Sequence, residues 1–236
     1  MRLLALETST RHFSIAVAQD DQILSMRDLV LDGVLSTSII PSIEQILKQS
    51  RTAITTIDGF AVGLGPGSFT SLRVGMSTVK ALAYATGKPV VGIPSLDAVA
   101  WGVREQLCDE ICVISDARRQ LLYSRIYKKT RAGLSPQGKC RLSGLEELLD
   151  HVSGETLFTG DGVALYRAEI ERRYAGAAGA RATDCRPLFA EEKFWFPKAE
   201  AVARLALPRF EKKKFDGIDK LVPLYLYPED CQVQKR

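Results

Sequence analysis

The N-terminal segment alternates apolar and polar residues in the pattern of a β-hairpin. An apolar run over 3–6 ends at the acid Glu7, and an alternating run resumes over 13–17. The residues between the two runs are small and polar, as turn residues commonly are: Thr8, Ser9 and Thr10. The pattern therefore predicts two antiparallel strands joined by a turn that begins with a carboxylate. The turn hydroxyls would either hold an anion or simply close the turn.

A later segment, 111–127, repeats this pattern of an apolar run, an acid and an alternating run. Its acid is Asp116, in the place that Glu7 has in the first copy. The segment 157–162 then repeats, in the same order, the strand and glycine loop found at 57–67. The chain therefore contains two copies of one α/β unit.

This duplication predicts both the fold class and the division of the chain. We expect a first lobe over 1–104, which carries the partner-binding helices described below, and a second lobe over 105–236. A return of the C-terminal segment to the first lobe is left open. Duplicated units with an acidic hairpin turn resemble the actin-like (ribonuclease H-like) two-lobed ATPase superfamily, so the expected fold is α/β of that kind.

The glycine-rich loop at Gly65, Gly67 and Ser68 lies between a predicted strand and a predicted helix. Such a loop brings backbone N–H groups close to an anion. It has no Lys after its last Gly and lacks the three-glycine dinucleotide spacing, so it is not one of the common nucleotide loops. The alternative is structural, because glycine with a capping serine is how many strand-to-helix turns are made.

Two helices follow from apolar residues at helical spacing. The first has apolar residues at helical spacing between Leu35 and Leu47, and Ser38 is its expected N-cap, so that Pro41 falls in the first turn. The second spans 69–86 and has apolar or small residues on nearly all sides, so it needs cover on two sides. One cover is its own sheet, and the other is either the preceding helix or a partner subunit. The residues expected to form the partner interface are Leu35, Ile39, Ile43, Leu72, Met76, Val79 and Ala83.

The composition is that of a folded protein without a membrane segment. The 236 residues are 46% hydrophobic, with a formal net charge of +4, too small to mark a nucleic-acid protein by itself. No apolar run approaches the length a bilayer needs and the N-terminus has no signal-peptide pattern, so we expect a cytoplasmic protein. The scattered cysteines and histidines predict neither a disulfide framework nor a metal site: Cys108, Cys112, Cys140, Cys185, Cys231, His12 and His151.

Several short blocks, in order over nearly the whole length, resemble the TsaB (YeaZ) family, whose members serve the bacterial synthesis of threonylcarbamoyladenosine in tRNA. The Gly-Pro-Gly-Ser-Phe-Thr block is the most specific of them. The chain departs from the family pattern at Glu7, where Asp is usual, at Leu35, where His is common, and at Ser71, where Gly is common. The matching blocks are Leu4-Ala5-Leu6-Glu7-Thr8-Ser9-Thr10, Gly65-Pro66-Gly67-Ser68-Phe69-Thr70, Leu72-Arg73-Val74-Gly75, Lys80-Ala81-Leu82-Ala83, Gly92-Ile93-Pro94-Ser95-Leu96, Asp116-Ala117-Arg118 and Pro223-Leu224-Tyr225-Leu226.

The resemblance implies a non-catalytic scaffold that binds TsaD through the two helices. TsaD would transfer threonylcarbamoyl from threonylcarbamoyl-AMP to the adenine 3′ of the anticodon, with TsaE as a third subunit supplying ATPase activity. The chain would form a homodimer when alone, contact tRNA only through the complex, and need no cofactor, although ATP or ADP and Mg²⁺ fit the assembled complex. The residues implied as a vestigial nucleotide site are Glu7, Thr8, Ser9, Thr10, Gly65, Gly67, Ser68 and Asp116.

Two other functions stay open. The glycine loop with Glu7 and Asp116 allows a small-molecule kinase or ATPase of the actin-like superfamily. A weaker hypothesis is autonomous tRNA binding by the basic residues Arg209, Lys212, Lys213 and Lys214, which are more simply explained as a solvated surface. For the scaffold interpretation, replacing Met76 or Val79 with Glu should abolish the complex without unfolding the chain.

Overall fold

The computed structural model describes residues 1–31, 33–177 and 186–227, and the chain divides into two compact units. Unit 1 comprises Met1–Gly102 and Phe196–Pro223, and unit 2 comprises Val103–Trp195 and the segment that begins at Leu224. The last segment of unit 1 therefore follows most of unit 2 in the sequence. Cys185 and Cys231 lie outside the described residues.

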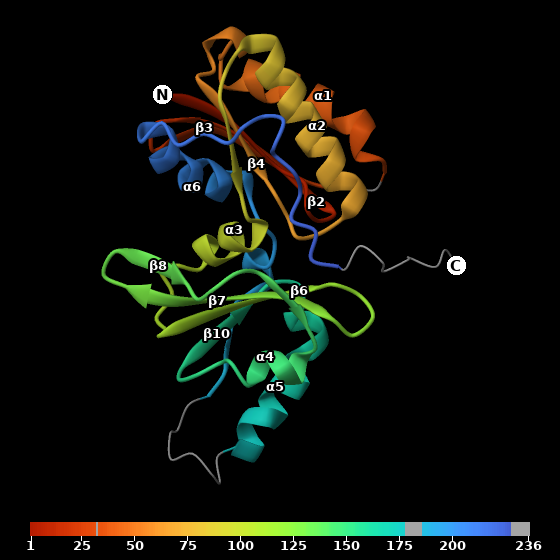
Figure 1. Cartoon of the computed structure of the whole chain (residues 1–236), viewed down its shortest axis with the longest axis vertical. Helices are drawn as coiled ribbons and strands as arrows, with labels where there is room; N and C mark the ends of the chain where they lie inside the picture. The colour runs from red at the N-terminus through yellow and green to blue at the C-terminus, as the bar shows by residue number, and fades with distance from the viewer. Residues whose placement is uncertain (32, 178–185, 228–236) are drawn as a thin grey trace. The chain divides into compact units, whose positions relative to one another are not determined.

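Unit 1 is a mixed sheet with helices on both of its faces (Figure 1). The strand order is β3-β2-β1-β4-β5, in which β1, β2 and β3 pair antiparallel, and β1, β4 and β5 pair parallel. The predicted N-terminal hairpin is confirmed as β1 and β2. The elements are β1 (Arg2–Glu7), β2 (His12–Gln19), β3 (Gln22–Val30), α1 (Leu35–Gln49), η1 (Ile54–Thr56), β4 (Gly59–Gly63), α2 (Phe69–Thr86), β5 (Val90–Ile93), α3 (Ser95–Gly102) and α6 (Ala199–Glu211).

The alternating residues of β1 supply two separate cores. Leu4 and Leu6 pack on the face that α1 and α2 cover, and Leu3 and Ala5 pack on the face that α6 covers. All four side chains are buried, and each fully buried leucine contributes about 2 kcal/mol. Because small residues line the second face, α6 lies close to the sheet: a Cβ at Gly59 would lie 2.2 Å from the Phe210 ring. Packing on both faces of the sheet thus holds the C-terminal ends of β1 and β4 in place.

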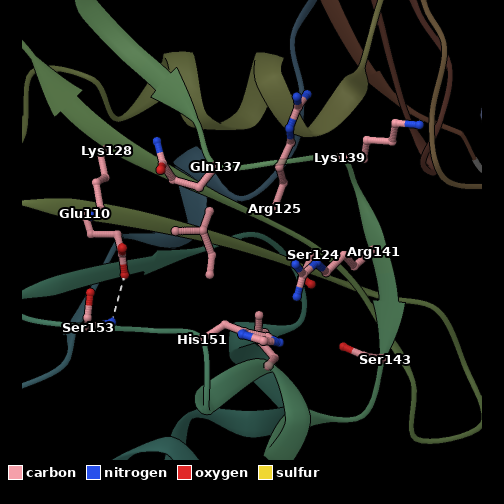
Figure 2. A pocket seen from close by; sticks show the side chains of 12 residues that line it. Glu110, Ser124, Arg125, Lys128, Gln137, Lys139, Arg141, Ser143, His151 and Ser153 are labelled. Carbon is pink, nitrogen blue, oxygen red and sulfur yellow. Dashed lines mark hydrogen bonds between the residues drawn. The ribbon is translucent and has the colours of Figure 1, made fainter.

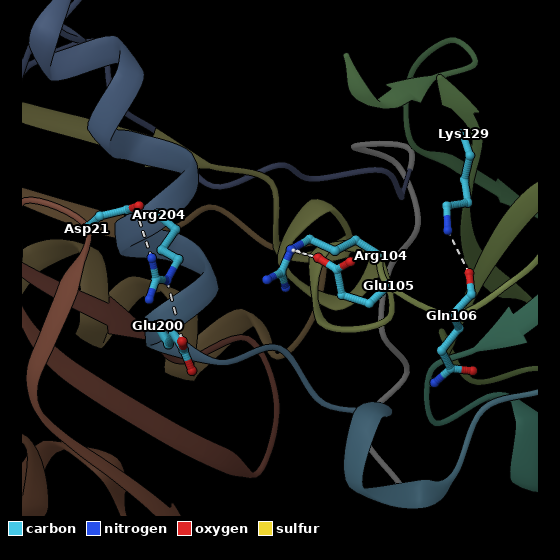
Figure 3. A network of polar contacts seen from close by, with 7 residues as sticks. All are labelled: Asp21, Arg104, Glu105, Gln106, Lys129, Glu200 and Arg204. Atoms are coloured by element: carbon cyan, nitrogen blue, oxygen red, sulfur yellow. Dashed lines mark hydrogen bonds and ion pairs between the residues drawn. The ribbon is translucent and has the colours of Figure 1, made fainter. Parts of the chain in front are cut away.

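Polar contacts fasten α6 to the far end of the hairpin. The Arg204 guanidinium donates to Asp21 Oδ1 at 2.7 Å and lies 3.5 Å from Glu200 Oε1 (Figure 3). At the start of the helix, Ala199 N donates to the buried Ser14 Oγ at 2.8 Å. The buried Ser14 bond replaces the side-chain cap that α6 lacks, so α6 is tied to β2 at its start and to the turn after β2 near its middle.

The first helix begins earlier than its sequence pattern predicts. Val34 is the N-cap and α1 starts at Leu35, so Ser38 is not the cap and Pro41 lies inside the helix rather than in its first turn. Leu35 and Ile39 are both buried against the sheet, and their burial extends the helix past the position that propensity favours. The second helix, α2, has the predicted bounds.

Unit 2 repeats the topology of unit 1. Its strand order β11-β10-β6-β7-β8 matches β5-β4-β1-β2-β3, and β6 pairs antiparallel with β7 and parallel with β10. The predicted duplication and the predicted α/β fold class are therefore confirmed. The elements are β6 (Glu110–Asp116), β7 (Leu122–Thr130), β8 (Gly133–Pro136), β9 (Arg141–Ser143), α4 (Leu145–Leu149), β10 (Thr156–Thr159), α5 (Val163–Ala177), β11 (Leu188–Phe189) and η2 (Glu192–Phe194).

The core of unit 2 lies between its sheet and the helices α4 and α5. Phe158, Ile114 and Leu122 are fully buried there. The segment before β6 is held by Lys129, whose Nζ donates to the Gln106 carbonyl at 2.6 Å (Figure 3). In the part of the chain that the structure describes, no helix is both long and apolar enough to cross a bilayer.

Candidate functional site

The turn after β1 and the loop after β4 lie against each other in unit 1. Ser68 N donates to the Ser9 carbonyl at 2.7 Å, and a Cβ at Gly67 would lie 2.1 Å from that same oxygen. The sequence-predicted residues of the turn and of the glycine loop are therefore brought together. The absence of a side chain at Gly67 is what allows the contact.

Glu7, at the centre of this arrangement, has no exposed surface. Its Oε1 accepts from Ser9 N at 2.7 Å, and its Oε2 accepts from Ser95 Oγ at 2.8 Å. A Cβ at Gly63 would lie 2.0 Å from Oε2, so the carboxylate fills the space that this glycine leaves. Both carboxylate oxygens therefore bond within the protein.

The N–H groups of the glycine loop also donate hydrogen bonds within the protein. Gly65 N donates to Ser95 Oγ at 3.0 Å, and Ser95 N donates back to the Gly65 carbonyl at 2.8 Å. Ser68 caps α2, since its hydroxyl accepts from Ser71 N at 3.5 Å. The amides of Gly65 and Ser68 are thus committed to Ser95 and Ser9. With these two amides occupied and Glu7 sealed, these residues do not fit a Mg²⁺–phosphate group.

The hydroxyls of Thr8, Ser9 and Thr10 differ in their contacts. Thr10 Oγ1 accepts from His12 N at 3.0 Å and so closes the turn. Thr8 Oγ1 and Ser9 Oγ are buried and have no hydrogen-bond partner among the described residues. Thr8 is directed at α2, because a Cβ at Gly75 would lie 2.3 Å from its Oγ1. Thr8 therefore helps to pack the helix onto the turn.

Burial raises the pKa of the Glu7 carboxyl above its ordinary value of 4.5, and hydrogen bonds from Ser9 and Ser95 only partly oppose this. The folded chain then binds this proton more tightly than the unfolded chain, so the stability present below about pH 4.5 declines as the pH rises through the raised pKa. We expect Glu7→Gln, which keeps the shape and carries no charge, to remove this decline.

Urea unfolding of wild type and Glu7→Gln at about pH 5 and about pH 8 measures the effect. The free energy of unfolding of the variant, relative to that of wild type, should be higher at about pH 8 than at about pH 5. A difference that does not change with pH would show that the Glu7 pKa is the same in the folded and unfolded chain.

The seven residues expected to form the partner interface do not lie on the surface. Each is at most 5% exposed, and all except Leu72 belong to the core between the helices and the sheet of unit 1. Their burial leaves little surface for direct contact with a partner in the folded chain, because their spacing marks the buried face of each helix. These residues are Leu35, Ile39, Ile43, Leu72, Met76, Val79 and Ala83.

The outer face of α1 and α2 has a different set of residues. The two helices lie side by side over one face of the sheet (Figure 1). On α2 the exposed residues are mostly small, with an exposed aromatic residue toward each end of the helix, and α1 adds an exposed isoleucine. The exposed residues of this outer face include Ile40, Phe69, Thr70, Arg73, Ser77, Ala81, Tyr84 and Ala85.

Comparison with known proteins identifies the family. A family model described as TsaD, tRNA N6-adenosine threonylcarbamoyltransferase, matches residues 35–173, more than half of the chain. The chain is 29% identical over 167 residues to the tRNA threonylcarbamoyladenosine biosynthesis protein TsaB of Escherichia coli, covering 69% of this chain and 72% of that protein. It is 28% identical to the TsaB of Bacillus subtilis over 174 residues, 72% of this chain and 76% of that protein. The chain belongs to the TsaD-like family, among its TsaB (YeaZ) members.

The fold of a solved TsaB-family structure agrees with this assignment. YeaZ from Pseudomonas aeruginosa superposes with a TM-score of 0.77 at 23% identity, covering 95% of this chain and 99% of that chain. The similarity therefore extends over both duplicated units of the chain. At this identity it shows the shared fold.

In unit 2 of this TsaB-family chain, Asp116 closes its own hairpin. Its Oδ1 accepts from Arg118 N at 2.8 Å, and its own N–H donates to Asp161 Oδ1 at 3.1 Å. Burial raises the pKa of Asp161. Gly160 and Gly162 approach the Ile114 carbonyl closely, as Gly67 approaches Ser9 in unit 1. The Asp116 side chain thus closes the turn, and its backbone N–H ties the turn to the loop after β10.

Sequence reasoning missed the roles of three residues in this TsaB-family site. Gly63 makes room for Glu7, Ser95 bridges Glu7 to the loop, and Gly75 makes room for Thr8. The signal for Gly75 was its place inside a helix, where glycine costs about 1 kcal/mol relative to alanine and so indicates close packing. Ser95 had no such signal, because it lies far from Glu7 along the chain.

The basic residues near the C-terminus do not form one group. Arg209 Nη1 donates to the Gly92 carbonyl at 3.1 Å and its Nη2 pairs with Asp216 at 2.9 Å, so this side chain holds α6 and β5 together. Lys212, Lys213 and Lys214 are exposed. The structural roles of Arg209 leave only the three lysines for the RNA-binding hypothesis.

Proposed function

We propose that this chain acts in the biosynthesis of tRNA threonylcarbamoyladenosine as a non-catalytic subunit that binds and supports a TsaD-type transferase. The observation that carries the proposal is the sealed Glu7 carboxylate, because both of its oxygens bond inside the protein. Glu7, at the end of the first strand, therefore helps to hold the turn and the glycine loop together. The names of the curated TsaB relatives supply the pathway.

The outer face of α1 and α2 is the surface we assign to the partner. Ser77, Ala81 and Ala85 are exposed and follow one another at intervals of four, so they form one stripe along α2. Small side chains let a partner helix approach closely, and the neighbouring Phe69 and Ile40 supply exposed apolar area. A helix pair on the partner would complete a four-helix contact.

Replacing Ala81 with Arg tests this surface. Ala81 is exposed and Arg is a good helix former, so the variant should fold as stably as wild type. The long charged side chain should weaken the complex with TsaD from the same organism at least about tenfold by keeping the two helices apart. Light scattering on a sizing column measures the complex.

The matched control is Leu165→Arg, which changes an exposed apolar residue on α5 of unit 2. It should leave the complex intact. Normal binding of Ala81→Arg would place the partner elsewhere, and no complex with wild type, with or without ATP and TsaE, would remove the basis of the proposal.

The other proposed partners follow from the same face. In the absence of TsaD a second copy of the chain would occupy it, TsaE would join the assembled complex, and tRNA would be reached through that complex. We propose that the chain itself needs no nucleotide or metal. ATP turnover by the isolated chain that is lost in Asp116→Asn would instead favour the kinase or ATPase alternative.

A further inference from the structure

Unit 2 contains a cavity of about 250 Å³ that has no part in the proposed function. It opens between β7, the segment that leads into β9, and the residues that follow α4 (Figure 2). A water molecule occupies about 30 Å³ in the liquid, so the cavity has room for several non-hydrogen atoms. Every residue that lines it belongs to unit 2.

The strand register gathers basic side chains on this cavity. Residues directly opposite each other on antiparallel strands share a face of the sheet, and Ser124 is opposite Arg141, while Lys128 is opposite Glu110. Lys139 also lines the cavity. Arg141 and Lys139 make no ion pair with any residue in the described part of the chain.

One acid lines the cavity, and it is already engaged. Glu110 is 3% exposed and accepts from Ser153 N and Thr156 Oγ1, each at 3.2 Å. Burial raises the pKa of Glu110, and the charge of Lys128 opposes the shift. Three cations, Lys128, Lys139 and Arg141, therefore line the cavity together with one carboxylate, and the cavity carries a net positive charge.

A buried hydroxyl without a partner in the described part of the chain belongs to Ser124, which is opposite Arg141 in the strand register. Ser124 is 1% exposed, and its Oγ has no hydrogen-bond partner among the described residues. Figure 2 shows Ser124 next to Arg141, with His151 across the cavity. Arg125 points the other way and donates to the Gly138 carbonyl at 2.9 Å. A buried hydroxyl that lacks a partner is destabilising unless a bound group supplies one.

We propose that this cavity binds the phosphate group of a small phosphate monoester, such as a sugar phosphate, with Arg141 as its principal ligand. The planar guanidinium can engage two phosphate oxygens, and Lys139 supplies a second cation. Ser124 lines the cavity and offers its hydroxyl to a ligand oxygen once the side chains that cover it move aside. The remaining volume accepts the organic part of the ligand.

A small ligand fits these features better than a nucleic acid backbone does. Lys139 and Arg141 are exposed and would contact either kind of ligand, but Ser124 is buried beneath them. A phosphodiester backbone that passes over the surface would leave the Ser124 hydroxyl without a partner. A terminal phosphate with free oxygens can enter the cavity.

Isothermal titration calorimetry of the full chain with ribose 5-phosphate, inorganic phosphate and ribose tests the proposal. Ribose 5-phosphate should bind, inorganic phosphate should bind more weakly, and ribose should not bind. Arg141→Gln should weaken ribose 5-phosphate binding at least about tenfold, and Ser124→Ala should weaken it several-fold. Arg172→Gln, which removes an exposed arginine from α5, should bind as wild type does.

Three results would overturn the proposal: no binding of either phosphate compound, equal binding of ribose and ribose 5-phosphate, or binding that Arg141→Gln leaves unchanged. Arg141-dependent binding of a short single-stranded RNA without binding of the small phosphates would assign the cavity to RNA instead. Thermal melting of each variant, followed by circular dichroism, verifies that it is folded. Complex formation with TsaD does not enter any of these readouts, so the two proposals fail or stand separately.

Discussion

Met76→Glu should unfold the chain rather than merely detach a partner. Met76 is 4% exposed and packs between α2 and the sheet of unit 1. A glutamate there would place an unpaired carboxylate in an apolar core and would also lose the packing of the methionine. We expect the free energy of unfolding to fall by about 4 kcal/mol or more, measured by urea unfolding followed by circular dichroism.

The control for this prediction is the same substitution on the outer face of the same helix. Ala81→Glu changes an exposed position, so its unfolding free energy should remain within about 0.5 kcal/mol of wild type. If Met76→Glu were as stable as Ala81→Glu, α2 would not pack through this face. The partner interface predicted from the sequence would then again be a candidate.

Gly67→Ala should destabilise the chain by about 3 kcal/mol, although it adds only one methyl group. The new Cβ would lie 2.1 Å from the Ser9 carbonyl oxygen, which belongs to the backbone and cannot rotate away. The same oxygen accepts the hydrogen bond from Ser68 N at 2.7 Å, so moving it would also break the contact between the turn and the loop. Urea unfolding measures the loss.

Gly102→Ala is the matched control for Gly67→Ala. Gly102 ends α3, and a Cβ there would meet no atom within 4 Å. Since alanine favours a helix more than glycine does, the change should be neutral or slightly stabilising. Equal losses for the two variants would show that the close approach of Gly67 to Ser9 contributes nothing to stability.

The helix pair shows how far a periodic pattern can be read. The spacing of Leu72, Met76 and Val79 correctly predicts a helix with these residues on one side, and α2 has the expected bounds. The pattern does not say whether the sheet or a partner covers that side, because either gives the same periodicity. The sheet covers it, and the small exposed residues opposite remain for a partner.

For Glu7, local sequence patterns likewise predict its position in the site but not its contacts. Its place at the end of the first strand, next to a glycine loop, followed from local patterns, because strands and turns depend on residues near in sequence. Its contacts did not, since Ser95 and Gly63 approach it only through the parallel pairing of strands distant in sequence. Burial and the raised pKa of Glu7 follow from that approach.

The sequence by itself determined the duplicated α/β architecture, the hairpin of each unit, the second helix and the family, because each depends on local periodicity or on contiguous motifs. Tertiary structure decided which carboxylates and loop amides are exposed, which helix face is free, and that 196–223 completes unit 1. It also brought Ser124 and Arg141 together on one cavity through strand register. Burial and long-range pairing depend on where distant segments meet, and no local pattern records that.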